Sequence, residues 1–199
     1  MPNKLERFDI FSVPVYTTEY VDDNGVNQYL KDLVTQLEDE DGDSKTDYCL
    51  SGYTSFKKHD NILSLDHCQH LLHYIGGAVD TIHKSTGLSG NIYLQNSWLS
   101  INRKYSYHEM HNHLPSTWSG VYYVEAKESD ANLTFVNSNL RSHWPFCRSD
   151  ENNMDNSANA IFESRTNVLY IFPSYLEHMV LEQKTDNERI TLSFNFGVD

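Results

Sequence analysis

The sequence contains few cysteines and few basic residues, and it has no long apolar run. Its three cysteines, Cys49, Cys68 and Cys147, lie far apart, are odd in number and form no C-x-x-C pair, which favours a reducing cytoplasmic environment. No stretch of 18 apolar residues occurs, and residues 1–7 contain no apolar run of signal-peptide length. We therefore expect neither a membrane span nor a secretory leader.

The shortage of basic residues also restricts the possible partners. The 15 Lys and Arg stand against 28 Asp and Glu, which gives a formal net charge of −13 that phosphate backbones would repel. Bulk nucleic-acid binding is therefore not expected. The chain does have 199 residues, an apolar content of 39% and an aromatic content of 13%. These values predict a single globular domain that is rich in strands.

The first part of the chain predicts an extended segment and a helix. Residues 8–20 are β-branched and aromatic, and they indicate an edge strand or two short extended pieces. Asp23 and Asn24 then precede an amphipathic helix as candidate caps. The acidic run 38–43 lacks the ligand spacing of a calcium loop, so we interpret it as a solvated helix end. The apolar stripe of this helix consists of Val26, Leu30, Leu33 and Leu37.

A second helix is predicted over residues 62–84. His67, His70 and His73 lie on the side opposite its apolar stripe. Adjacent pairs of these histidines could share an adventitious zinc ion, but a solvated polar face is the preferred interpretation. The buried stripe is predicted to consist of Leu65, Cys68, Leu71, Leu72, Ile75, Val79 and Ile82.

From residue 91 onward the apolar period changes to that of strands. Two helices followed by antiparallel strands predict an α+β fold, mainly β, with the helices on one face of a sheet. The polar segment 137–167 is long for a loop, so its Trp144 and Phe146 are candidates for a lid over substrate or for a surface-loop anchor. Strands are predicted over residues 92–103, 119–125, 133–136, 168–172 and 189–196.

The last predicted strand has one polar and one apolar face. Its polar face either meets water or lines the interior of a barrel that holds a polar ligand. Apart from one arginine, the polar side chains are short, as expected for such a lining. The polar residues are Arg189, Thr191, Ser193 and Asn195, and they alternate with Ile190, Leu192, Phe194 and Phe196.

The segment His111-Asn112-His113 is the clearest chemical signal. On an extended strand, both imidazoles point to the same side. His178 could complete three ligands of a non-heme Fe(II) centre, and Arg189 could hold an acidic cosubstrate. Two alternatives remain at this point. Each histidine could be purely structural, and His108 and Glu109 lie close enough to offer other ligand sets, such as Glu109 with His111.

Several strings occur in a characteristic order along the chain: P-V-Y from Pro14, G-Y-T-S from Gly52, S-W from Ser97, H-N-H-L-P from His111, S-G-V-Y-Y-V from Ser119, F-P-S-Y-L-E-H from Phe172 and R-I-T-L-S-F-N from Arg189. In these strings, which span most of the chain, the sequence resembles a family of 2-oxoglutarate- and Fe(II)-dependent oxygenases of marine bacteria and their phages. The wider superfamily includes prolyl hydroxylases. The resemblance implies a double-stranded β-helix (jelly-roll) core over about residues 91–199, supported by a helical part over about residues 1–90.

The resemblance also implies a set of site residues. His111, His113 and His178 would hold Fe(II), and Arg189 would pair with the distal carboxylate of 2-oxoglutarate. His113 departs from the wider superfamily, in which the second ligand is normally Asp or Glu, although H-x-H is usual in this subfamily. Three further residues are implied to bind the cosubstrate: Thr191, Tyr123 and Asn102.

The implied activity is that of a dioxygenase that hydroxylates a small-molecule or peptide substrate with O₂, releasing succinate and CO₂. Two other functions stay open: a three-histidine cupin-type dioxygenase that does not use 2-oxoglutarate, and a non-enzymatic jelly-roll binding protein. Arg189, Thr191 and Tyr123 favour the first activity, because such a cupin needs no carboxylate clamp. The sequence identifies neither the substrate nor the oligomeric state. We expect the protein in the cytoplasm, which would be the host's if a phage encodes it.

Overall fold

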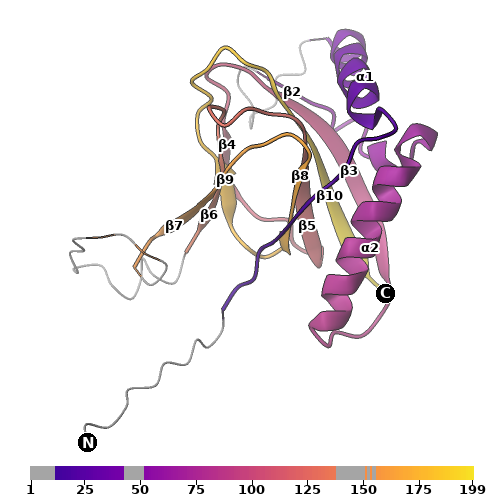
Figure 1. The fold of residues 1–199 in the computed structure, drawn as a ribbon, viewed down its shortest axis with the longest axis vertical. Coiled ribbons are helices and arrows are strands. Elements are labelled where there is room, and N and C mark those ends of the chain that lie inside the picture. The colour runs from indigo at the N-terminus through magenta and orange to yellow at the C-terminus, as the bar shows by residue number, and fades with distance from the viewer. Residues whose placement is uncertain (1–11, 43–51, 138–150, 152, 154–155) are drawn as a thin grey trace, which may run out of the picture.

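The fold consists of two helices and ten strands in the part of the chain that the computed structural model describes, namely residues 12–42, 52–137, 151, 153 and 156–199 (Figure 1). The helices are α1 (Val26–Asp41) and α2 (Gln69–Ser85), and the 3-10 turns η1 (Ile62–Ser64) and η2 (Asp66–Cys68) precede α2. The strands are β1 (Tyr16–Glu19), β2 (Tyr53–Thr54), β3 (Ile92–Asn102), β4 (His108–His111), β5 (Trp118–Glu125), β6 (Leu133–Val136), β7 (Asn159–Phe162), β8 (Val168–Pro173), β9 (His178–Val180) and β10 (Arg189–Val198).

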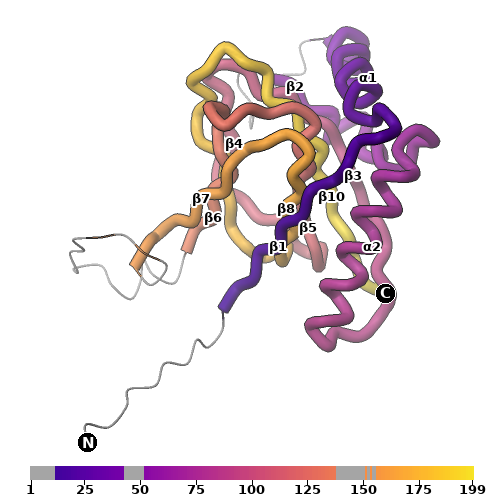
Figure 2. The backbone as a smooth tube through the Cα atoms, viewed as in Figure 1, coloured from indigo at the N-terminus to yellow at the C-terminus, as the bar shows by residue number. Residues whose placement is uncertain are grey.

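The strands form two antiparallel sheets. A six-stranded sheet has the order β1-β8-β5-β10-β3-β2, and a four-stranded sheet has the order β4-β9-β6-β7. Figures 1 and 2 show the two sheets as opposite layers, with both helices on the outer side of the six-stranded sheet. The predicted α+β fold, mainly β, with two helices on one face of a sheet, is confirmed.

Strand β10 separates the apolar core from the interior between the sheets. Ile190, Leu192 and Phe194 are buried in the cluster that also contains the inward faces of both helices. The opposite face carries Arg189 and Thr191, which are buried as well. Because both faces of β10 are covered, the polar side chains line the interior instead of meeting water, as the second interpretation of this strand expected; that they hold a polar ligand stays a prediction.

Gly120 on β5 allows the close packing of this sheet. A Cβ atom at this position would overlap the ring of Phe194 and would lie 2.5 Å from the carbonyl oxygen of Tyr170. Gly120 pairs with Phe194 of β10 and with Ile171 of β8. Only glycine therefore fits between these neighbouring strands.

Helix α1 starts as predicted, but its cap differs in part. Asp22, and not Asp23, binds the first turn: its carboxylate accepts hydrogen bonds from the backbone N–H groups of Val26 (2.8 Å) and Asn27 (3.1 Å). Oδ1 of Asn24, the other predicted cap, accepts a longer bond from Val26 (3.4 Å). Gly25 adopts the left-handed conformation (φ 73°), which brings the chain round so that Asp22 reaches these groups. Val34 is buried where Leu33 was expected, and Leu33 is only partly buried.

The second helix begins later than predicted. Residues 62–68 form the two 3-10 turns, so Leu65 is exposed and does not belong to the buried stripe. The rest of the stripe is buried or, at Leu72, partly buried. His67, His70 and His73 are exposed, as expected for a solvated face, and the ring of His67 stacks on Tyr29.

The four-stranded sheet contains elements that the sequence pattern did not reveal. Strands β4, β7 and β9 have three or four residues each and were not predicted, because segments this short seldom show a clear period-two pattern. Strand β7 lies in the segment predicted as a loop, where its Phe162 pairs with Leu133. Trp144 and Phe146 lie outside the described residues. Within the described residues, no helix has the length and apolarity needed to cross a membrane.

Candidate metal centre and cosubstrate pocket

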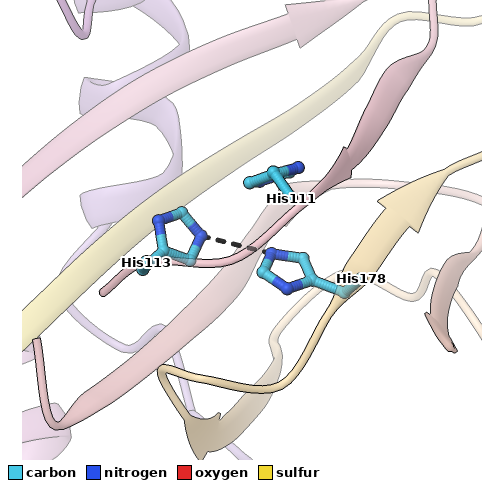
Figure 3. A group of neighbouring side chains, drawn as sticks. All are labelled: His111, His113 and His178. Carbon is cyan, nitrogen blue, oxygen red and sulfur yellow. Dashed lines mark hydrogen bonds between the residues drawn. The ribbon is translucent and has the colours of Figure 1, made fainter. Parts of the chain in front are cut away.

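Three histidines meet at the edge of the four-stranded sheet. His111 is the last residue of β4 and is paired in register with His178, the first residue of β9. His113 lies two residues beyond β4, outside the strand, and its backbone N–H binds the carbonyl oxygen of Ser174 (2.9 Å). Each histidine offers one ring nitrogen to a group whose atoms all lie within 4.8 Å of one another. Figure 3 shows the three side chains side by side.

Backbone carbonyl groups fix the orientation of two of these rings. Nδ1 of His111 lies 2.6 Å from the carbonyl oxygen of Glu109, and Nδ1 of His178 lies 2.9 Å from that of Leu176. A carbonyl can only accept, so both Nδ1 atoms carry the proton, and both Nε2 atoms present a lone pair. Metal-binding histidines in proteins are commonly held in this way.

Burial keeps two of the imidazoles neutral. Burial, with a smaller contribution from the nearby His111, lowers the pKa of His178 to about 3 and that of His113 to about 4. The rings of Phe172 and Phe135 cover His178, with ring centroids 4.8 and 6.0 Å away. Neutral imidazoles bind metal ions without first losing a proton, so the site is ready for a cation at neutral pH.

The spacing of the nitrogens also suits a metal ion. Nε2 of His113 and Nε2 of His178 are 3.2 Å apart. Two imidazole nitrogens at about 2.1 Å from one ion, in adjacent positions at a right angle, are about 3.0 Å apart. The donor set therefore fits a divalent transition metal. Glu109, the alternative ligand, is exposed and does not belong to the group.

A buried guanidinium lies at the start of β10, where Arg189 is the first residue. Arg189 is 2% exposed, and its Nε, Nη1 and Nη2 donate to Ser164 Oγ (3.2 Å), Asn102 Oδ1 (2.9 Å) and Tyr123 Oη (3.2 Å). All three partners are neutral, and no carboxylate of the described residues forms a salt bridge with Arg189. The bonds use three of its five N–H donors. A buried cation with unused donors is costly without an anion, so the donors of Arg189 suit a carboxylate ligand.

Sheet register explains why these residues meet. Arg189 is paired with Asn102 of β3, and Thr191 is paired with Tyr123 of β5. Thr191 is buried on the same face of β10 as Arg189. The structure thus brings together all four residues that were predicted for the cosubstrate. Among them, Asn102 contacts the guanidinium of Arg189 directly, through its side-chain oxygen.

Two neighbours of Arg189 were not predicted. Ser164 lies in the segment that was expected to be a loop, and no periodicity distinguishes it. His108 was considered only as an alternative metal ligand, but its Nε2 lies 3.0 Å from Asn102 Nδ2, and it is not part of the three-histidine group. Burial, followed by the positive charge of Arg189 and then by His111, lowers the pKa of His108 to about 3.

Aromatic side chains pack near the histidine group, next to His113. The ring of Trp98 lies 5.7 Å from that of His113, and Phe56 packs edge-on against Trp98 at 4.8 Å. Phe56 is half-exposed. These rings extend from the histidine group to the surface.

The fold is shared with solved structures of low sequence identity. A Pseudomonas putida prolyl-4-hydroxylase superposes with a TM-score of 0.66 at 12% identity, covering 94% of each chain. HygX from Streptomyces hygroscopicus, solved with nickel and 2-oxoglutarate bound, gives a TM-score of 0.60 at 11% identity and covers 94% of this chain and 83% of its own. SnoK, an alpha-ketoglutarate-dependent carbocyclase from nogalamycin biosynthesis, gives 0.62 at 11% identity, covering 92% and 79%.

These similarities define the class of protein. The double-stranded β-helix expected for the core is confirmed, and it is the fold of the 2-oxoglutarate-dependent oxygenases. A family model described as "Putative 2OG-Fe(II) oxygenase" matches residues 96–195, a little over half of the chain. The chain belongs to this family and is a non-heme iron enzyme that uses Fe(II) and 2-oxoglutarate. A comparison with curated proteins found no match.

Proposed function

We propose that the protein is a dioxygenase that hydroxylates a small-molecule or peptide substrate. Iron and 2-oxoglutarate supply the chemistry: with O₂, 2-oxoglutarate is decarboxylated to succinate and CO₂, and the second oxygen atom enters a C–H bond of the substrate. The observation that carries the proposal is the grouping of three imidazoles, together with a buried guanidinium that pairs with no carboxylate of the described residues.

The residues then have separate tasks. His111, His113 and His178 hold the metal. Arg189 binds the distal carboxylate of 2-oxoglutarate through its two remaining N–H donors, one on each terminal nitrogen. Because this pocket is buried, water does not compete for these donors.

Thr191, Tyr123 and Asn102 complete the cosubstrate pocket. Thr191 lies one pleat from Arg189 on the interior face of β10. Tyr123 binds Arg189 Nη2 through its hydroxyl group, and its ring lies 4.9 Å from the guanidinium carbon. The hydroxyl group of Tyr123 still has a proton to donate to the carboxylate.

The cupin-type alternative makes a different prediction for Arg189. A three-histidine dioxygenase that binds its organic substrate directly on iron has no use for a buried arginine with free donors. The pocket of Arg189 therefore supports the use of 2-oxoglutarate. Origin in marine bacteria or phages, cytoplasmic location and a single-domain chain stay predictions.

Release of succinate tests the proposal. Purified protein, supplied with Fe(II), O₂ and 2-oxoglutarate, is expected to form succinate even without a substrate, at a slow uncoupled rate. Arg189→Ala should abolish this at the same cosubstrate concentration. If the wild-type protein forms no succinate, and Arg189→Ala leaves a metal-dependent oxidation intact, the cupin-type function is correct.

A further inference from the structure

The amide oxygen of Asn102 faces Arg189. Asn102 is fully buried, and its Oδ1 accepts a hydrogen bond from Arg189 Nη1 over 2.9 Å. A guanidinium has only donors, so the oxygen of the amide must face it. The NH₂ group of Asn102 therefore points away from Arg189, toward Ser106 and His108.

Two acceptors receive this NH₂ group. Asn102 Nδ2 lies 3.2 Å from Ser106 Oγ and 3.0 Å from His108 Nε2. The hydroxyl group of Ser106 donates its proton to the carbonyl oxygen of Arg103 over 2.6 Å, so it can only accept from Asn102. His108 Nε2 must likewise present a lone pair, which puts the ring proton on Nδ1.

We propose that His108 is a positioning residue that locks the Asn102 amide and thereby orients Arg189 for the distal carboxylate of 2-oxoglutarate. Without an acceptor at residue 108, the buried amide keeps its contacts with Arg189 and Ser106 but loses one of the hydrogen bonds that oppose its rotation. A rotated amide would point its NH₂ group at the guanidinium, donor against donor. Arg189 would keep Ser164 and Tyr123, but Nη1 would lose the bond that fixes it.

The inference rests on the proposed function, because it assigns Arg189 to the cosubstrate. It concerns the distal carboxylate alone. Bidentate binding of a carboxylate requires both terminal nitrogens of Arg189 to be held in place, whereas metal binding by the three histidines does not. Replacement of His108 should therefore weaken binding of the distal carboxylate and leave metal binding by the three histidines unchanged.

The test compares two 2-oxoacids on the metal-loaded protein, without O₂. 2-Oxoglutarate carries the distal carboxylate, and 2-oxopentanoate has a methyl group in its place. Calorimetry of His108→Leu should give a Kd for 2-oxoglutarate that is about tenfold higher than in the wild type, while the Kd values for 2-oxopentanoate and for Mn²⁺ change less than about twofold. His108→Met, equally unable to accept a strong hydrogen bond, has the same expected result.

Two variants act as controls. His108→Gln keeps an acceptor and should restore the 2-oxoglutarate Kd to within about threefold of the wild type. His73→Leu makes the same change on the exposed face of α2 and should alter nothing. An unchanged 2-oxoglutarate Kd in His108→Leu or His108→Met overturns the inference. So does an equal loss for both 2-oxoacids, which would indicate a merely structural role.

A double-mutant cycle tests whether His108 acts through Asn102. In an Asn102→Ala background, His108→Leu should raise the 2-oxoglutarate Kd no further. A second tenfold loss in that background would contradict the proposed route. Arg189→Ala distinguishes a failure of the proposed function from a failure of the role of His108. If this variant leaves 2-oxoglutarate binding intact, Arg189 does not bind the cosubstrate and the proposed function is wrong. If it abolishes binding while His108→Leu is neutral, only the role of His108 is wrong.

Discussion

Nε2 of His113 and Nε2 of His178 lie 3.2 Å apart, although 65 positions separate the two residues in the chain. Since His178 donates its Nδ1 proton to Leu176, its Nε2 holds a lone pair, and His113 must supply the proton between the two nitrogens when no metal is bound. A cation placed between these nitrogens takes over the role of that proton. His113 and His178 would then each hold the ion through Nε2, with the ring proton of His113 on its Nδ1.

Metal binding is therefore expected to stabilise the fold. At a free Ni²⁺ concentration of about 100 times Kd, the free energy of unfolding should rise by about 2.7 kcal/mol, because the ion binds only the folded state. Thermal unfolding with Ni²⁺ and with a chelator measures this. His178→Ala should abolish the increase, and the exposed His70→Ala should retain it. An equal increase in His178→Ala would place the ion elsewhere.

Arg189→Lys tests the geometry of the guanidinium separately from its charge. Lysine keeps a positive charge but loses the planar pair of donors, so the KM for 2-oxoglutarate should rise about tenfold or more. Succinate formation at increasing 2-oxoglutarate concentrations measures the change. A KM equal to that of the wild type would show that the fork of donors is not used.

Two glycine-to-alanine changes should have opposite effects on stability. Gly77 lies in α2 with open space around an added Cβ atom, so Gly77→Ala should raise the free energy of unfolding by about 0.5–1 kcal/mol. Gly120→Ala should lower it by about 1–3 kcal/mol or more, because the methyl group overlaps Phe194. Urea unfolding measures both. A stabilising Gly120→Ala would contradict the close strand packing.

The carboxylate of Asp130 should make stability depend on pH. Burial acts to raise its pKa, but hydrogen bonds from the backbone of Lys127 and from the side chains of Asn187, Gln183 and Thr185 outweigh this and lower the pKa. A lowered pKa in the folded state stabilises the protein above the unfolded pKa of about 3.9, and this contribution is lost as the pH falls through the folded value.

Asp130→Asn should therefore lower the free energy of unfolding at pH 7 by about 1–3 kcal/mol. The difference from the wild type should shrink as the pH falls below about 4. Urea unfolding over this pH range measures the difference, with the exposed Asp39→Asn as a control for the loss of one charge. A difference of the same size at pH 3 and pH 7 would contradict the role of the carboxylate.

The sequence was sufficient where a pattern is long or a motif is specific. Strand β10 alternates from Arg189 to Phe196, so its start and its division into a polar and an apolar face could be anticipated, although it runs two residues further, to Val198. His111, His113 and His178 were grouped correctly, because the spacing of the first two and the family resemblance both indicate it.

The remaining contacts depend on register, which no local pattern reveals. Strands β4 and β9 are too short to be recognised, yet their pairing brings His111 beside His178. Ser164 and His108 contact Arg189 and Asn102 only after both sheets have formed. The start of helix α1 is a further example: the left-handed backbone of Gly25 brings Asp22, which was not among the predicted caps, to the first turn, where Asn24 makes only a longer bond.

The central claim is that three histidines hold iron beside an arginine that binds the cosubstrate. Anaerobic addition of Fe(II) and then 2-oxoglutarate should produce a visible metal-to-ligand charge-transfer band, since the 2-oxoacid chelates a ferrous ion held by neutral imidazoles. His111→Ala and His178→Ala should lose the band, and Arg189→Ala should require far more 2-oxoglutarate to form it. A wild-type protein without the band, or a His178→Ala protein that retains it in full, would contradict this account.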